Sequence, residues 1–428
     1  MKTGIVFLCL FVSTLFISCS APANFEKDGG LRLTLTINYS DFLKSYCINK
    51  DDTLLTHVLH EITNEKVNNF SGFMDLYQKT LENIYPGTQM ATSFMSFEMQ
   101  DKINFNTSND ELKNIFQTEW DAVIKNVINI LTKRIESIDI ENASITIQNG
   151  NTLIVEIPGI KEKEKMMNLV PSIGDLGFWE TYTNEEFFTY LQNINDYLKK
   201  SNFRFAEDSL NTKNKNIDST DIVALIESQN NEIDNNNIEE NPLFNVLIPA
   251  INNEGKFMYG AVIGYVNMKD TAKFNQLLKM DSVLYLLPHK CRLMYAIPNK
   301  NLEGNVFEII ALKCTNREGR PAIDGTIITS AKAEKSDYGF EISIVMNTEG
   351  AKMWKRMTAE NIGRQIAIVL DNKVYSFPTV QTPIEGGKSM ISGNFTEQEA
   401  KNLASILNAG KYPVKVTISQ IDVVEGKK

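Results

Sequence analysis

Apolar and polar residues alternate strictly along residues 31–37, so that every second residue belongs to one apolar face. This period of two predicts a β-strand with one buried side. Residues 52–85 instead carry apolar positions three and four apart, which predicts helix. The longest predicted helix spans residues 108–136, because one apolar stripe runs along it behind a capping box formed by Ser108 and Glu111.

A tight turn at Asn149-Gly150 is predicted to join two short strands, because this residue pair readily adopts the positive φ angles of a two-residue hairpin loop. A helix at residues 161–170 and a strand at 176–182 follow. From residue 31 onward the order is therefore strand, helix, two strands, helix and strand. This is the split β-α-β-β-α-β pattern of ferredoxin-like folds. We predict an α+β protein of antiparallel sheets with helices packed on one face.

The second half of the chain shows a similar mixture after a polar interruption. Residues 211–242 are rich in Asn, Asp, Glu and Ser, which predicts an exposed, mobile excursion without an assigned function. Ordered patterning returns from Phe257. The last helix is predicted from a Thr396–Glu399 capping box to a stop at Gly410. The other predicted strands are residues 260–265, 291–297, 307–314, 339–346, 366–370, 374–377 and 414–424, and the other predicted helices are 271–279 and 348–359.

Composition excludes several classes of protein. The 428 residues include 43 Lys and Arg against 53 Asp and Glu, a net charge of −10. Binding of nucleic acid requires a basic face that displaces counterions from phosphates, so we expect no nucleic-acid partner. Three histidines and five cysteines argue against a His-rich metal centre or a dense disulfide framework.

No motif of a known catalytic or cofactor site is present, and the remaining candidates are better explained by structure. His57 and His60 lie three apart on a predicted helix, but no third ligand completes a metal site. Gly386-Gly387 is not followed by a helix N-terminus that would bind phosphate. The acidic residues Glu180, Glu185 and Glu186 would need a shared cleft to act as a hydrolytic pair. We therefore predict no catalytic residue, no cofactor and no metal.

The N-terminus has the features of an export signal. A charged start, an apolar run at residues 4–17 and small residues beyond predict that residues 1–18 are a signal peptide. The sequence before Cys19 resembles a bacterial lipoprotein signal, which implies that the Cys19 thiol carries a lipid that anchors the protein to a membrane. The alternative is a plain signal peptide that Cys19 merely follows. In either case we expect the chain on the periplasmic side of the cell envelope.

Two further cysteines lie on consecutive predicted strands. A hairpin turning near residues 302–303 would set Cys291 opposite Cys314, at a Cα separation that allows a disulfide. The alternative is two unpaired buried thiols, because a shift of one residue sends the two side chains to opposite faces of the sheet.

Several ordered blocks resemble the first periplasmic domain of the SecD and SecDF protein-export family, most of all its Bacteroidetes-type members. They include Gly29-Gly30 before the first strand, the V-E-I-P-G-I segment from Val155 and the F-W-E-T-Y segment from Phe178. The most specific block begins at Met346 and continues through G-R-Q-I-A-I-V-L-D to Asp371. I-S-G-N-F-T from Ile391 is similar to the family's closing motif.

The resemblance implies a base domain with an inserted, mobile head that captures translocating polypeptide. It assigns residues 29–183 to the N-terminal part of the base, 184–316 to the head and 317–428 to the C-terminal part. Residues 137–142 replace the turn usual in the family after the long helix. Family members continue into transmembrane helices that couple proton flow to movement, whereas the sequence to Lys428 shows none, so we expect no proton-driven motor.

Three functions remain open from the sequence. The first is a non-enzymatic, membrane-tethered accessory that binds translocating or unfolded polypeptide near the Sec channel subunits. The second is a SecD-derived envelope lipoprotein that serves as an interaction or scaffold module unrelated to export. An extracytoplasmic hydrolase is the third, and it requires a cleft with converging acids.

Overall fold

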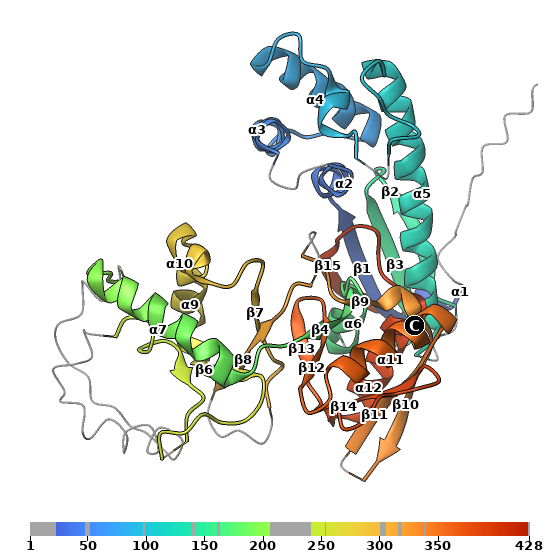
Figure 1. The fold of residues 1–428 in the computed structure, drawn as a ribbon. Coiled ribbons are helices and arrows are strands. Elements are labelled where there is room, and N and C mark those ends of the chain that lie inside the picture. Colours follow the sequence, from blue (N-terminus) through green and yellow to red (C-terminus); the bar gives the residue numbers. More distant parts are fainter. Residues whose placement is uncertain are drawn as a thin grey trace, which may run out of the picture. The chain divides into compact units, whose positions relative to one another are not determined.

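A computed structural model describes residues 23–47, 52–96, 99–138, 140, 142–160, 163–205, 241–252, 254–299, 305–315, 319–337 and 339–426. The described chain divides into two compact units (Figure 1). Unit 1 contains the described residues up to Pro171 together with those from Pro413 onward. Unit 2 is the continuous segment Ser172–Tyr412.

Unit 1 is built on one antiparallel sheet of four strands in the order β15-β1-β3-β2. If β15 is counted as the fourth strand, this is the strand order of a ferredoxin-like fold, and the predicted α+β class with antiparallel sheets is confirmed. Alternation in β1 places its apolar residues on the buried side of the sheet. The strands are β1 (Gly29–Ile37), β2 (Ser144–Gln148), β3 (Thr152–Pro158) and β15 (Val416–Glu425).

The prediction that residues 176–182 form the fourth strand of this sheet was wrong. β4 (Leu176–Glu180) does form where a strand was expected, but it pairs with β12 (Ile366–Leu370) in unit 2, and β15 takes the place beside β1. The alternation of side chains indicates that a segment is a strand, and it does not identify the partner. Because β15 pairs along the whole of β1, from Gly29 to Ile37, it covers an edge that the five residues of β4 would leave partly open.

A helical subdomain in unit 1 connects β1 to β2. The helix-rich stretch predicted over residues 52–85 forms two helices, the second of which Asn69 caps by accepting the Gly72 N–H. An aromatic cluster forms the core of the subdomain, in which the rings of Phe70 and Trp120 stack at 5.2 Å. The helices of unit 1 are α1 (Ala23–Asp28), α2 (Tyr39–Ser45), α3 (Thr53–Glu61), α4 (Phe70–Ile84), η1 (Met90–Ser93), α5 (Asn109–Glu136) and α6 (Lys163–Leu169).

Arg134, on α5, is fully buried in unit 1. Its guanidinium donates a hydrogen bond to the carbonyl oxygen of Leu169, at the end of α6, with an Nη1 to O distance of 3.2 Å. A buried cation is costly unless its donors are matched by acceptors. Arg134 therefore joins the two helices of the ferredoxin-like unit at a point where an apolar side chain would leave a carbonyl without this donor.

Unit 2 contains three antiparallel sheets, ordered β13-β12-β4-β9, β10-β11-β14 and β5-β6-β8-β7. Beyond β4, the strands are β5 (Ile248–Pro249), β6 (Val262–Asn267), β7 (Arg292–Tyr295), β8 (Val306–Leu312), β9 (Ile323–Asp324), β10 (Ile328–Ser336), β11 (Gly339–Met346), β12 (Ile366–Leu370), β13 (Lys373–Ser376) and β14 (Lys388–Phe395). The helices are α7 (Asn184–Lys200), η3 (Met268–Asp270), α9 (Thr271–Leu277), α10 (Asp281–Leu286), η4 (Gly325–Ile327), α11 (Thr348–Glu360) and α12 (Glu397–Ala409).

The sheet β5-β6-β8-β7 is buried on both faces. Ile309 and Ala311 of β8 belong to a core shared with α7, α9 and α10, which Figure 1 shows grouped beside β6. The alternate residues Ile310 and Leu312 belong to a second core, which β12 and β13 also line. Alternate side chains of β8 thus pack against the helices on one face of the sheet and against the sheet that contains β12 and β13 on the other.

The free edge of β10 is covered within unit 2. Asn408, on α12, accepts a hydrogen bond from the N–H of Ala331 and donates one to its carbonyl oxygen, both at 2.7 Å. The carboxamide therefore takes the place that a neighbouring strand would occupy. An edge covered in this way is less open to pairing with another chain.

None of the helices in the described ranges is both long enough and apolar enough to cross a bilayer.

Candidate functional site

Several predicted features lie outside the described residues. They are the signal peptide at residues 1–18, the lipidation site Cys19 and all of the polar excursion 211–242 except its last two residues.

The predicted register of Cys291 and Cys314 was wrong by one residue. Arg292 pairs with Leu312, so the position opposite Cys291 is Lys313. The two side chains therefore pack on opposite faces of the sheet, Cys291 against the helix-facing core and Cys314 against the other core, and both thiols are free. Burial raises the pKa of Cys291 to about 12 and also raises that of Cys314, so both remain protonated thiols at neutral pH.

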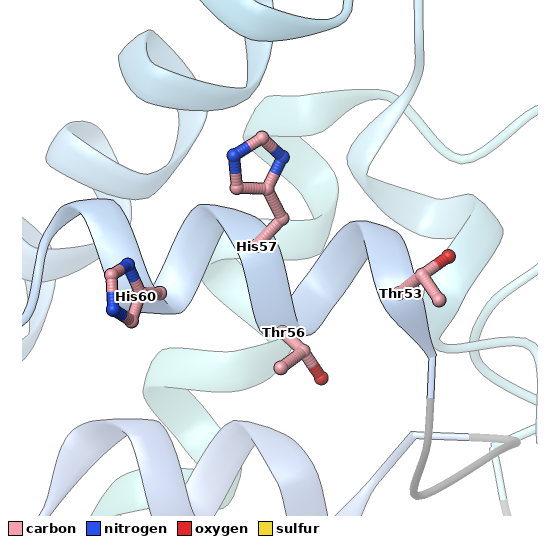
Figure 2. Close-up of a pocket in the computed structure, with 4 residues that line it drawn as sticks. All are labelled: Thr53, Thr56, His57 and His60. Carbon is pink, nitrogen blue, oxygen red and sulfur yellow. The ribbon is translucent and has the colours of Figure 1, made fainter.

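His57 and His60 line a shallow depression on α3 together with Thr53 and Thr56. Figure 2 shows the two imidazole rings pointing in different directions from the helix. His57 Nδ1 lies 2.9 Å from the Tyr85 hydroxyl, and both rings lie 3.9 Å from a carboxylate oxygen of Glu61. Across the described ranges, no group of three or more His, Cys, Asp or Glu residues is arranged to hold a metal.

Glu186 is held in an ion pair and is not arranged as a catalytic acid. Arg364 donates two hydrogen bonds to its carboxylate, at 2.8 and 3.3 Å, and Lys313 lies 3.7 Å away. Mainly through the Arg364 hydrogen bond, the pKa of Glu186 falls to about 2, so the group has no proton to give at neutral pH. Gly386-Gly387 is a loop packed against Ala351 of α11.

Unit 2 also carries an exposed apolar run that no sequence argument singled out. Phe257, Met258 and Tyr259 follow one another on the β5–β6 connection, and their exposed fractions are 39%, 45% and 78%. The ring of Phe188, on α7, lies 4.9 Å from that of Phe257. We call Phe188, Phe257, Met258 and Tyr259 the aromatic strip. Ile362 is 54% exposed and directly precedes Gly363, whose carbonyl oxygen accepts a hydrogen bond from the Tyr259 hydroxyl.

The strip is carried by a closed turn. Asn252 Oδ1 accepts hydrogen bonds from the N–H groups of Glu254 and Lys256, and the Asn252 N–H donates to the Lys256 carbonyl at 2.8 Å. Ile251 then bridges Phe257 across the turn. Side chain to backbone bonds of this type make a turn that needs no neighbouring strand. The backbone at the start of the strip is therefore ordered locally.

Further contacts fasten the end of the strip to the first residue of α7 and to the turn before β12. Asn184 is 1% exposed, and its side chain amide donates to the carbonyl oxygens of Ala250 and Met258. Its N–H donates to the Gly260 carbonyl at 2.8 Å, and the Tyr259 hydroxyl donates to the Gly363 carbonyl. The strip is thus an exposed apolar surface on a backbone held from two sides.

Sequence reasoning missed the strip because a short apolar run predicts a buried strand as readily as an exposed loop. The available signal was its position directly after Asn252–Gly255, where Asn and Gly favour a turn.

Two segments of the chain match known family profiles. Residues 311–414 match the SecDF P1 head subdomain, and residues 124–183 match the N-terminal part of the P1 domain of protein translocase subunit SecDF. The first segment differs from residues 184–316, which were predicted as the head.

Curated relatives are similar over longer stretches. Protein translocase subunit SecD of Rhodothermus marinus is 27% identical over 394 residues, which cover 92% of this chain and 61% of the relative. SecD of Dictyoglomus turgidum is 38% identical over 144 residues, or 32% of this chain and 36% of the relative. The chain therefore spans about three fifths of the length of the Rhodothermus protein.

Solved structures of SecDF are similar at lower identity. A SecDF structure described as a membrane component that enhances protein export has 18% identity and a TM-score of 0.36, and the match covers 70% of this chain and 92% of that one. SecDF of Thermus thermophilus, described as translocon-associated, has 16% identity and a TM-score of 0.25, with 93% of this chain and 31% of that chain covered.

Proposed function

We propose that this chain, a member of the SecD and SecDF family, is a non-enzymatic accessory of protein translocation that binds extended polypeptide outside the cytoplasm. The observation that carries the binding role is the aromatic strip. The ligand is an unfolded or emerging chain with exposed apolar side chains. Subunits of the Sec channel are the proposed neighbours.

The chemistry of the strip suits such a ligand. Aromatic side chains contribute large contact areas, and Met adapts to apolar groups of different shape. The Asn252 turn orders the backbone before binding, which lowers the entropy lost on association. Because these contacts involve few directed hydrogen bonds, we expect binding that is weak and tolerant of sequence.

The proposal keeps residues 184–316 as the region that captures polypeptide, since it contains the whole strip. The assignment of a head domain to residues 184–316 is part of the proposal. The profile of the family's head subdomain matches a different segment, residues 311–414. We propose that the described residues bind polypeptide, and we assign proton coupling to none of them.

Substitutions in the strip test the polypeptide-binding role. Tyr259→Ala and Phe257→Ala are expected to weaken binding of a fluorescent, unstructured apolar peptide at least about fivefold each, as for central contacts of an interface. Phe105→Ala is the matched control, because Phe105 is an aromatic residue of unit 1 that is 75% exposed. Fluorescence anisotropy measures the affinities.

In cells, a photoreactive residue at position 259 is expected to crosslink to exported chains or channel subunits, and one at position 105 is not. Equal peptide affinities for all variants, together with crosslinks only to other envelope proteins, would contradict the binding function. That result would favour the alternative, a scaffold module unrelated to export.

We also propose that lipid on Cys19 tethers the protein to a membrane. Cys19→Ala is expected to move the protein from the membrane fraction to the soluble fraction, because the thioether lipid would be lost. Immunoblots of fractionated cells measure the distribution, with the Cys47→Ala variant as control. Retention of Cys19→Ala in membranes would argue for a different anchor.

A further inference from the structure

Gln365, immediately before β12, is fixed to its surroundings from three directions. Its carbonyl oxygen accepts a hydrogen bond from Thr181 Oγ1 at 2.7 Å, and its backbone bridges Thr379. Its side chain Oε1 accepts the N–H of Ala261 at 2.6 Å. A side chain held in this way has few alternative rotamers, so it can define the position of the backbone that it contacts.

The backbone in contact with Gln365 directly follows the aromatic strip. Ala261 is 1% exposed and belongs to the core shared with β12, whereas Tyr259, two residues earlier, is 78% exposed. Gly260 separates them with a φ of +121°, and an added Cβ there would lie 2.8 Å from Gln365 Oε1. The chain therefore leaves the surface and enters the core against the Gln365 carboxamide.

We propose that Gln365 is a positioning residue for polypeptide binding: its carboxamide holds residues 259–261 so that the aromatic strip keeps its exposed arrangement. The proposal rests on the binding function proposed above. Gln365 acts through the Ala261 N–H and does not contact the ligand.

The contact made by Gln365 differs in kind from those of its neighbours. The Glu186–Arg364 ion pair joins α7 to the turn before β12 and makes no bond to the strip backbone. Asn184 bonds the carbonyl groups of Ala250, Met258 and Gly260, and so fixes acceptors. The N–H of Ala261 instead bonds the Gln365 side chain, and loss of that acceptor would leave a buried donor unsatisfied.

Two substitutions at position 365 separate positioning from general stability. Gln365→Ala removes the acceptor, and Gln365→Glu keeps an oxygen at the same reach. Hydrogen exchange followed by mass spectrometry is expected to show amides 257–261 exchanging at least about tenfold faster in Gln365→Ala. Exchange in residues 388–409 should stay at the parental rate, and Gln365→Glu should restore slow exchange at 257–261.

Peptide anisotropy on the same variants completes the test. Gln365→Ala is expected to bind the apolar peptide about fivefold more weakly, and Gln365→Glu to recover most of the affinity. Parental exchange at 257–261, or parental affinity in Gln365→Ala while Tyr259→Ala binds weakly, would overturn the positioning role and leave the binding function standing. Parental affinity in Tyr259→Ala and Phe257→Ala would overturn the binding function, and with it the role of Gln365.

Discussion

Gly30→Ala is expected to destabilise unit 1 by about 3 kcal/mol or more, because there is no space for a side chain at that position. An added Cβ at Gly30 would lie 2.1 Å from the carbonyl oxygen of Ile157 on β3. β1 and β3 cannot move apart without breaking the hydrogen-bond ladder that joins them. Urea unfolding followed by hydrogen exchange in peptides of unit 1 measures the effect.

Gly87→Ala is the matched control for Gly30→Ala. Both glycines have a positive φ, +156° at Gly30 and +81° at Gly87, but nothing lies within 4 Å of a Cβ added at Gly87. That substitution carries only the conformational cost of the left-handed region, about 1 kcal/mol. Equal losses in the two variants would show that the clash with β3 is relieved at little cost.

Arg134→Ala is expected to cost about 2 to 5 kcal/mol of unit 1 stability, the range for truncating a large, fully buried side chain. The substitution creates a cavity between α5 and α6 and removes the donor to the Leu169 carbonyl. Exchange in peptides of α5 and α6 should accelerate, while peptides of unit 2 stay at their parental rates.

Arg134→Met separates volume from hydrogen bonding. It fills most of the space and supplies no donor, so we expect a loss intermediate between parent and Arg134→Ala. If Arg134→Met is as stable as the parent, packing alone explains the burial of Arg134 and the bond to Leu169 contributes little.

Features that depend on neighbours in sequence were predictable. The capping boxes at Ser108 and Thr396 both form as expected, with Glu111 and Glu399 donating and accepting the reciprocal bonds through backbone and side chain. β11 and β12 have the predicted boundaries, since alternation and flanking turns define them within a few residues. β11, β12 and the Thr396 capping box lie within residues 311–414, which match the profile of the SecDF P1 head subdomain.

Features that depend on distant partners were not predictable. β15 pairs with β1, and nothing in its sequence distinguishes it from β4 as the partner of that strand. The Cys291–Cys314 register required the length of the turn to within one residue, and periodicity does not give it. The aromatic strip required knowing that Phe257 is uncovered, which is a property of the assembled unit 2 and not of its local sequence.

The insertion of unit 2 between α6 and β15 sets the order in which the protein is made and folds. About 380 residues separate the end of β1 from the start of β15, and at about 5 to 20 residues per second a ribosome needs about 20 to 80 seconds to supply them. Unit 2 is continuous in sequence, and nearly all of it is synthesised in that interval, because α12 ends at Ala409 and β15 begins at Val416. The edge of β1 that pairs with β15 therefore stays unpaired for most of the synthesis of the chain. Pairing of β15 with β1, which completes the sheet of unit 1, is the last and most non-local step.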